Sequence, residues 1–225
     1  MNTNRYRRHD LVWLDPDVDA GAFAVDGQAE LVRQWIRQNL PFVVARQPEP
    51  FLKEANHIRL GFTLPSAPVR TRIMLRADRA AIVRHTPPLP LLDAMRHAPA
   101  AWQAGLERLH ALFENTRTVA RVYGSLSSQV FTGKTYLDDA SDLDLLLECG
   151  EDTKLLDLLA GLETMPPSSP RIDGEVLSAG GWAVAWRELA AALRTDAPRQ
   201  VLAKSDSEAR LLDVDAFIQP LLISV

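Results

Sequence analysis

Residues 140–147 of this chain read Ala-Ser-Asp-Leu-Asp-Leu-Leu-Leu. In an extended strand, side chains two positions apart point to the same face, so Asp142 and Asp144 present both carboxylates on one side while the leucines anchor the strand. Two carboxylates this close repel each other, which raises their pKa values unless a cation lies between them, and Mg²⁺ is the expected cation. The alternative is a polar start to a strand at a sheet edge. The stretch predicts a strand whose two acids are candidate metal ligands and catalytic residues.

A glycine-serine turn precedes this acidic strand, within residues 123–128, which read Tyr-Gly-Ser-Leu-Ser-Ser. The β-branched and aromatic segment 118–123 predicts a strand, and Gly124 allows a tight turn into a short helix that reaches about Phe131. Gly124 also lets the backbone approach a phosphate without a side-chain clash, Ser125 adds a hydroxyl donor, and the first helical amides add further donors. The order of strand, turn, helix and acidic strand favours transfer of a phosphoryl-linked group from a triphosphate.

A third acid is expected from the segment 171–176, which reads Arg-Ile-Asp-Gly-Glu-Val. Asp173 is the preferred third metal ligand, because the glycine after it permits close backbone approach. Glu175 lies on the same predicted face, and it is the alternative ligand or a base toward the incoming hydroxyl. A β-turn built on Asp-Gly is the alternative interpretation of this segment. Lys204, at the end of an apolar segment, is a candidate phosphate contact, although a solvent-exposed lysine is the commoner outcome.

A proline-rich stretch at residues 86–90, Thr-Pro-Pro-Leu-Pro, predicts a domain boundary because prolines remove amide donors and disfavour helix. Residues 1–86 hold 13 Lys/Arg against 9 Asp/Glu, whereas residues 87–225 hold 12 against 20. The smaller basic domain, 1–86, is therefore expected to bind an acidic partner or phosphates, and the acidic domain, 87–225, carries the site. Solvated arginines are the alternative for the basic cluster, which comprises Arg59, Arg70, Arg72, Arg76, Arg79 and Arg84.

Hydrophobic periodicity predicts an α+β fold in both domains, with helices packed on a mixed sheet in the second. In the first domain the expected strands are 11–14, 42–45, 57–62, 69–75 and 80–83, with a helix over 28–38. In the second, helices are expected over 100–115, 153–162 and 187–194, and further strands over 143–147, 172–177, 182–186 and 201–204. Trp182 and Trp186, four apart on a predicted strand, should share one face and pack in the core or a domain interface.

Bulk composition excludes several classes of function. The 225 residues carry a net charge of −4, which disfavours nucleic-acid binding because such binding neutralises phosphates. No apolar run approaches the roughly 18 residues that span a bilayer, and the N-terminal residues lack the apolar stretch of a secretory signal, so a cytoplasmic location is expected. The single cysteine, Cys149, excludes an internal disulfide, and we expect it to be a small buried hydrophobe.

From Val119 to Val176 the chain resembles the nucleotidyltransferase superfamily, whose members carry a Gly-Ser turn, an acidic pair separated by one apolar residue, and a third acid on a later strand. Residues 134–139 form an apparent extra loop relative to compact members. The resemblance implies a nucleotidyltransferase-like mixed sheet.

A closer resemblance, to the malonate decarboxylase holo-acyl-carrier-protein synthases, is carried by residues 9–14 (His-Asp-Leu-Val-Trp-Leu), 41–46 (Pro-Phe-Val-Val-Ala-Arg), 124–147, 172–175 and 183–189 (Ala-Val-Ala-Trp-Arg-Glu-Leu).

This family consists of phosphoribosyl-dephospho-CoA transferases, and the resemblance implies a specific reaction. A serine hydroxyl of the apo acyl-carrier subunit of malonate decarboxylase attacks the α-phosphate of 2'-(5''-triphosphoribosyl)-3'-dephospho-CoA, and pyrophosphate leaves. Mg²⁺ neutralises the triphosphate, and Asp142 and Asp144 are the acids expected to be essential. Under this interpretation the arginines between Arg59 and Arg84 steer an acidic carrier protein or grip the pyrophosphate end of the donor.

Two other functions remain open on the sequence. One is a nucleotidyltransferase that transfers a nucleotide to another small molecule, RNA or protein. The other is a catalytically silent scaffold that binds a nucleotide or a carrier protein. The complete set of Asp142, Asp144 and Asp173 argues against the scaffold, because such a protein has no need to hold three acids together.

Overall fold

The computed structural model describes residues 6–19, 27–48, 56–65, 71–166, 170–194 and 199–221. Its chain divides into two compact units. The first comprises Met1–Pro88, Phe131–Thr135 and Asp206–Glu208, and the second comprises Leu89–Val130, Tyr136–Ser205 and Ala209–Val225. Each unit has its own hydrophobic core, so each is described separately.

The N-terminal unit is a five-stranded antiparallel sheet with the order β4-β3-β2-β1-β5. Its elements are β1 (Leu11–Leu14), α1 (Ala29–Arg37), β2 (Phe42–Val44), β3 (His57–Leu64), β4 (Thr71–Asp78), the 3₁₀ turn Arg79–Ala81 and β5 (Ile82–Thr86). The predicted strand over 80–83 is wrong at its start, because Asp78 accepts a hydrogen bond from the Ala80 amide and caps the 3₁₀ turn there. Val69 and Arg70, in the predicted strand 69–75, lie outside the described residues.

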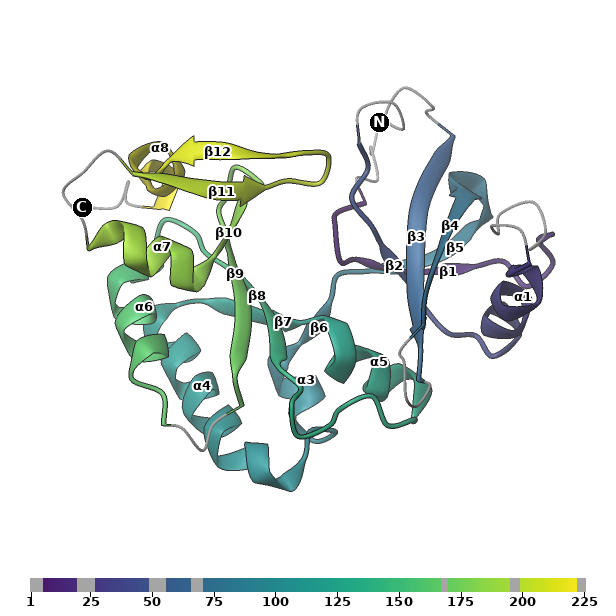
Figure 1. The fold of residues 1–225 in the computed structure, drawn as a ribbon, viewed down its shortest axis with the longest axis horizontal. Coiled ribbons are helices and arrows are strands. Elements are labelled where there is room, and N and C mark those ends of the chain that lie inside the picture. Colours follow the sequence, from purple (N-terminus) through teal and green to yellow (C-terminus); the bar gives the residue numbers. More distant parts are fainter. Residues whose placement is uncertain are drawn as a thin grey trace. The chain divides into compact units, whose positions relative to one another are not determined.

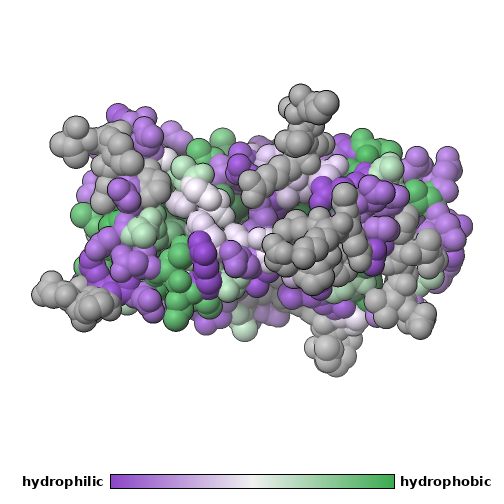
Figure 2. All heavy atoms as spheres, turned by 90° about the horizontal axis from the view of Figure 1, so that it is seen from above, coloured by the Kyte–Doolittle hydropathy of each residue, from purple (hydrophilic) through white to green (hydrophobic). Residues whose placement is uncertain are grey.

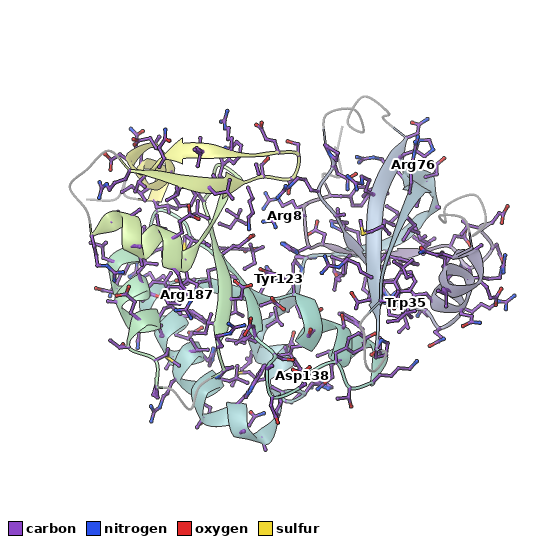
Figure 3. The ribbon with its side chains drawn as sticks, viewed as in Figure 1. Arg8, Trp35, Arg76, Tyr123, Asp138 and Arg187 are labelled. Carbon is purple, nitrogen blue, oxygen red and sulfur yellow. The ribbon has the colours of Figure 1, made fainter. Side chains whose placement is uncertain are left out.

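Helix α1 packs one face of this sheet through its apolar side (Figure 1). Trp35 is the main anchor: its ring stacks on Phe62 with centroids 4.3 Å apart. The indole Nε1 of Trp35 donates a 2.9 Å hydrogen bond to the carbonyl oxygen of Pro41, which satisfies its polar group inside the core. The label in Figure 3 marks this residue on α1 beside the sheet. The predicted helix 28–38 is therefore confirmed, and its apolar periodicity encodes this packing.

The C-terminal unit is built on a seven-stranded sheet with the order β12-β11-β10-β9-β8-β7-β6. Strands β8 and β9 are parallel, and the other neighbouring strands are antiparallel, so the sheet is mixed as the sequence predicted. The strands are β6 (Leu89–Pro90), β7 (Val119–Val122), β8 (Leu143–Glu148), β9 (Ile172–Leu177), β10 (Ala183–Ala185), β11 (Gln200–Lys204) and β12 (Ala209–Asp213).

Helices of this unit pack on one face of the sheet, and Figure 1 shows α4, α6 and α7 together on one side of β9. Leu143, Leu145 and Leu147 alternate along β8 and are fully buried in the core beneath these helices. The helical elements are α3 (Leu91–Met95), a 3₁₀ turn (Ala100–Trp102), α4 (Gln103–Thr116), α5 (Gly124–Thr132), α6 (Leu155–Glu163), α7 (Trp186–Leu193), α8 (Val214–Ile218) and the 3₁₀ turn Gln219–Leu221.

The expectation for Trp182 and Trp186 is wrong about a shared strand face but confirmed for core packing, because Trp186 is in the buried core and Trp182 packs against it. Trp186 is the first residue of α7 and is buried, so it does not share a strand face with Trp182. Its indole Nε1 donates to the carbonyl oxygen of Ile172 at 3.3 Å. Trp182 lies before β10, and the Arg210 guanidinium stacks 4.5 Å from its ring centroid. Helical packing around Trp186 therefore overrides the strand-like local pattern.

Surface apolar side chains are interspersed with polar ones on the face that Figure 2 shows. On the C-terminal hairpin, Leu202 of β11 and Leu211 of β12 are exposed cross-strand partners. Within the described parts of the chain, no helix is long and apolar enough to cross a bilayer.

Candidate active site

The face of the C-terminal sheet opposite its helices carries the predicted acids, and we call it the acidic face. Asp144 of β8 and Asp173 of β9 are directly paired in the parallel register, and Leu146 is paired with Glu175 two residues later. Side chains of paired residues lie on the same face of a sheet, so Asp144, Asp173 and Glu175 share the acidic face. The Asp-Gly pair lies inside the continuous strand β9, which rules out the alternative of a turn there.

Gly124 lies against the carboxylate of Asp144. Its φ is +66°, a left-handed conformation that L side chains rarely adopt, and a Cβ atom added there would lie 1.9 Å from Oδ2 of Asp144. The preceding amide, that of Tyr123, donates to the carbonyl oxygen of Asp144 at 3.2 Å. Because α5 begins at Gly124, the Gly-Ser turn and the first turn of this helix lie beside the acid. The structure therefore brings Gly124, Ser125 and Asp144 together despite the long intervening loop.

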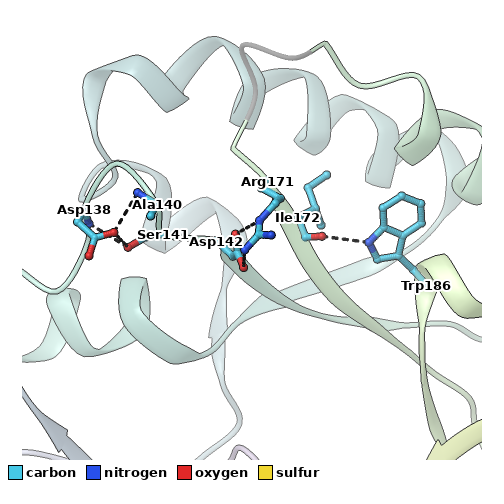
Figure 4. A network of polar contacts seen from close by, with 7 residues as sticks. All are labelled: Asp138, Ala140, Ser141, Asp142, Arg171, Ile172 and Trp186. Atoms are coloured by element: carbon cyan, nitrogen blue, oxygen red, sulfur yellow. Dashed lines mark hydrogen bonds and ion pairs between the residues drawn. The ribbon is translucent and has the colours of Figure 1, made fainter. Parts of the chain in front are cut away.

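The loop between α5 and β8 is fixed by its own hydrogen bonds (Figure 4). The Asp138 carboxylate accepts from the amide of Ala140 at 3.1 Å and from the hydroxyl of Ser141 at 2.8 Å. Earlier in the loop, the side-chain oxygen of Gln129 accepts from the amide of Tyr136 at 3.1 Å, and Tyr136 is buried. This loop, the extra loop in the sequence, delivers Asp142 to the start of β8.

Asp142 forms a bidentate ion pair with Arg171 (Figure 4). Asp142 precedes β8 and Arg171 precedes β9, and the amide of Leu143 donates to the carbonyl oxygen of Arg171 at 2.8 Å. The hydrogen bond that Arg171 donates to Asp142 raises the pKa of the Arg171 guanidinium above its ordinary value, and the charge of Asp173 adds to this effect. The prediction that Asp142 lies within the strand is wrong by one residue, because β8 begins at Leu143.

Glu175 and Lys204 form a second ion pair on the acidic face. Lys204 Nζ lies 2.8 Å from Oε1 of Glu175, whose side chain is only 7% exposed, whereas the Lys204 side chain is 32% exposed. A buried carboxylate is costly unless a cation and hydrogen bonds compensate it. Lys204 provides that compensation, so the expectation of a simply exposed terminal lysine is wrong. Both residues were candidates from the sequence, but their pairing across 29 positions was not foreseen.

Three further polar residues near the acids were missed by sequence reasoning. Arg171 belongs to the segment that supplies the third acid, and its charge beside an acidic strand was the available signal. Arg121 of β7 pairs with Glu148 of β8, with 2.8 Å between Nε and Oε1. Gln129 holds the loop before Asp142. The partners of Arg121 and Gln129 follow from strand register and loop path, which no local pattern reveals.

The acids fit a divalent cation only in part. Asp144 and Asp173 offer carboxylate oxygens from adjacent positions on one face, and such oxygens are the ligands that Mg²⁺ prefers. Among the residues that the structure describes, however, no group of three His, Cys, Asp or Glu side chains is placed to hold a metal ion. Asp142 faces Arg171 instead. The carboxylate pair is therefore the part of the set that is compatible with a metal, and Asp142 could be a ligand only after leaving Arg171.

Four arginines of the N-terminal sheet, Arg59, Arg72, Arg76 and Arg84, lie on the face away from α1. Arg59 of β3 and Arg76 of β4 are direct cross-strand partners, and Figure 3 labels Arg76 on this sheet. Arg84 of β5 stacks over the ring of Trp13, with the guanidinium carbon 3.4 Å from the centroid. The arginines at these positions concentrate positive charge on this face of the sheet. Arg70, which the sequence grouped with these residues, lies outside the described residues.

Comparison with known proteins identifies relatives of both units. Residues 7–88 match the N-terminal domain, and residues 90–215 the C-terminal domain, of the family described as phosphoribosyl-dephospho-CoA transferase MdcG. The chain is 38% identical over 208 residues to a phosphoribosyl-dephospho-CoA transferase of Xanthomonas campestris pv. campestris strain 8004, covering 91% of this chain and 93% of that protein. It is 34% identical over 218 residues to a protein of the same name from Bradyrhizobium diazoefficiens, covering 94% and 92%. No solved structure matches at comparable significance.

Proposed function

This chain belongs to the phosphoribosyl-dephospho-CoA transferase family, and from that membership we propose that it modifies an acyl-carrier protein. The donor is 2'-(5''-triphosphoribosyl)-3'-dephospho-CoA, and the acceptor is a serine of the apo acyl-carrier subunit of malonate decarboxylase. The serine oxygen forms a bond to the α-phosphorus, the bond from that phosphorus to the bridging oxygen breaks, and pyrophosphate leaves. The hydroxyl proton passes to a base or to water. We assign the reaction to the cytoplasm.

The arrangement of Gly124, Asp144 and Asp173 is the observation that carries this proposal. A turn that leaves space for an acid, followed by a helix, is suited to holding a polyphosphate beside carboxylates. Asp144 and Asp173 are paired in register, so both act on the same point of the acidic face. Positioning of reactants and stabilisation of developing charge are the main contributions to phosphoryl transfer.

We further propose that Asp144 and Asp173 bind Mg²⁺, with Asp142 as an additional ligand. The ion, when bound, neutralises phosphate charge and polarises the phosphorus centre. Asp173 is better suited than Glu175 to this role, because it lies opposite Asp144 whereas Glu175 is engaged by Lys204. Ser125 and the first amides of α5 are the proposed phosphate donors. Glu175 is instead paired with Lys204, which compensates its buried charge.

The arginine-bearing face of the N-terminal sheet, which we call the basic face, is the proposed contact for the acidic carrier protein or for the pyrophosphate end of the donor. Its described arginines, Arg59, Arg72, Arg76 and Arg84, lie on β3, β4 and β5, and Asp78 of β4, which caps a turn, also belongs to this sheet. A concentration of one charge speeds encounter with a partner of the opposite charge and makes the rate depend on salt.

Intact-protein mass spectrometry tests the proposed function. The purified chain and Mg²⁺ are mixed with the apo acyl-carrier subunit and the triphosphoribosyl donor. We expect the carrier to gain the mass of the donor less pyrophosphate, and a carrier with alanine in place of its acceptor serine to gain nothing. An unmodified carrier, with transfer from ATP to a different acceptor, would instead assign the chain to nucleotidyl transfer.

A further inference from the structure

We propose that Arg171 is the cation that contacts the donor's phosphates, and that Lys204 is a structural partner of Glu175 rather than a phosphate contact. This inference rests on the proposed function, because it names a donor contact of the same site. The donor group concerned is the triphosphate.

Position is the first argument for Arg171. It immediately precedes β9, and its carbonyl oxygen accepts from the amide of Leu143 at the start of β8. Its side chain reaches Asp142, and Asp173 follows it two residues later on β9. Arg171 therefore lies at the end of the sheet where the acids are gathered, close to where the proposed cation and triphosphate must meet.

Chemistry is the second argument. The guanidinium of Arg171 holds both oxygens of the Asp142 carboxylate through Nε and Nη2. A planar fork that fits a carboxylate also fits two oxygens of a phosphate, whereas an ammonium interacts as a point charge. The triphosphate carries more negative charge than one carboxylate, so exchange of Asp142 for phosphate is favourable. It also releases Asp142 toward the proposed metal.

The ion pairs of Arg171 and Lys204 differ in their exposure to solvent. The Arg171 side chain is 71% exposed and that of Asp142 is 23% exposed, so solvent screens the pair and little stability is lost when it breaks. Glu175 is only 7% exposed, and removal of Lys204 would take away the ammonium that faces this buried carboxylate. Breaking the ion pair of Arg171 therefore costs little free energy, whereas breaking the ion pair between Lys204 and Glu175 costs much more.

Direct binding of inorganic tripolyphosphate, measured by isothermal titration calorimetry in the presence of Mg²⁺, tests the inference. We expect Arg171→Ala to weaken binding by about 10- to 100-fold, the size of a lost charged hydrogen-bonding partner, and Arg171→Lys to restore part of it. The matched control is Arg194→Ala, another exposed arginine in an ion pair, with Glu163, which should bind as the wild type does. Lys204→Met should retain tripolyphosphate binding at a temperature where circular dichroism shows it folded.

Wild-type affinity in Arg171→Ala would overturn the inference, as would a loss of binding in Lys204→Met alone. The donor's kinetic constants distinguish this failure from failure of the proposed function. If the wild type modifies the carrier and Arg171→Ala does so with an unchanged donor KM, the inference fails while the function stands. If Arg171→Ala loses tripolyphosphate binding but the wild type never modifies the carrier, the function fails while the phosphate contact stands.

Discussion

Gly124 leaves the space that the carboxylate of Asp144 fills. An added Cβ would lie 1.9 Å from Oδ2 of Asp144, closer than any pair of such atoms can approach. The same glycine begins α5, the helix whose first amides are proposed to bind phosphate. A single backbone position therefore sets both the place of the acid and the direction of the helix.

Substitution of Gly124 by alanine should reduce transfer by about 100-fold or more, because displacement of Asp144 by about 1 Å is enough to misalign the reaction. Gly133→Ala is the matched control. Gly133 has the same φ of +66° but has nothing within 4 Å of an added Cβ, so it bears only the cost of the left-handed backbone, about 1–2 kcal/mol. Steady-state rates and thermal unfolding of both variants separate the clash from the strain. Equal activity in the two variants would show that the contact with Asp144 is unimportant.

Replacement of either paired acid should abolish transfer without unfolding the protein. Asp144→Asn and Asp173→Asn keep the shape of the side chains but remove the charge that the proposed cation requires, so we expect rates at least about 100-fold lower. Asp157→Asn, an exposed acid in the first turn of α6, is the control. Transfer is measured by carrier mass and folding by circular dichroism. Near wild-type turnover in both active-site variants would remove the argument for a metal site.

Lys204→Met should lower the free energy of unfolding by about 3 kcal/mol, because the buried Glu175 carboxylate loses its compensating cation. The double variant Glu175→Gln with Lys204→Met should recover much of this loss, since no buried charge remains. Urea unfolding measures both. Glu163→Gln, which breaks the exposed pair with Arg194, should cost less than about 1 kcal/mol. A similarly small cost for Lys204→Met would mean that Glu175 is well solvated without it.

Arg171→Ala should bind Mn²⁺, used as a probe for Mg²⁺, about threefold to tenfold more tightly than the wild type. The guanidinium competes with a metal ion for Asp142 and repels it, so its removal favours the ion. Electron paramagnetic resonance of free Mn²⁺ gives the affinity without reference to activity. Arg194→Ala should leave the affinity unchanged. Weaker Mn²⁺ binding in Arg171→Ala would show that Arg171 supports the metal site rather than competing with it.

Cys149 should resist thiol reagents in the native protein. Burial raises the pKa of its thiol to about 12, so almost no thiolate forms at pH 8. Because the chain has one cysteine, Ellman's reagent should report one thiol per chain in guanidinium chloride and a far slower reaction without it. Below the raised pKa, the native reaction should accelerate about tenfold for each unit of pH, because the thiolate fraction rises by that factor. Rapid native labelling at pH 8 would show that the β8 end opens readily.

The sequence predicted the elements that hold the site better than the contacts within it. The alternating leucines of β8 and the glycine that begins α5 are local signals, and both elements formed where they indicated. Cys149 is buried as expected. By contrast, the pairing of Asp144 with Asp173 depends on a parallel register between strands that are joined through α6. Local periodicity predicts which face of a strand a residue occupies, but it does not predict which strand lies beside it or in what register.

The ion pairs of the acidic face were not predictable for the same reason. Arg171 and Asp142 are 29 positions apart in the chain, as are Lys204 and Glu175, and each pair forms only once the strands align. Trp186 shows a different limit. Its surroundings read as a strand, but its burial and its hydrogen bond to Ile172 make it the start of a helix. Tertiary packing decides the secondary structure at such positions, and the local sequence of a short segment does not determine it.

Simultaneous measurement of pyrophosphate and modified carrier tests the central claim most directly. In one reaction with the triphosphoribosyl donor, Mg²⁺ and the apo carrier subunit, pyrophosphate release is followed enzymatically while samples are weighed by mass spectrometry. We predict one pyrophosphate for each carrier modified by the wild type, and neither product above background with Asp144→Asn. Carrier modification at the wild-type rate by Asp144→Asn, or modification without stoichiometric pyrophosphate, would contradict the account.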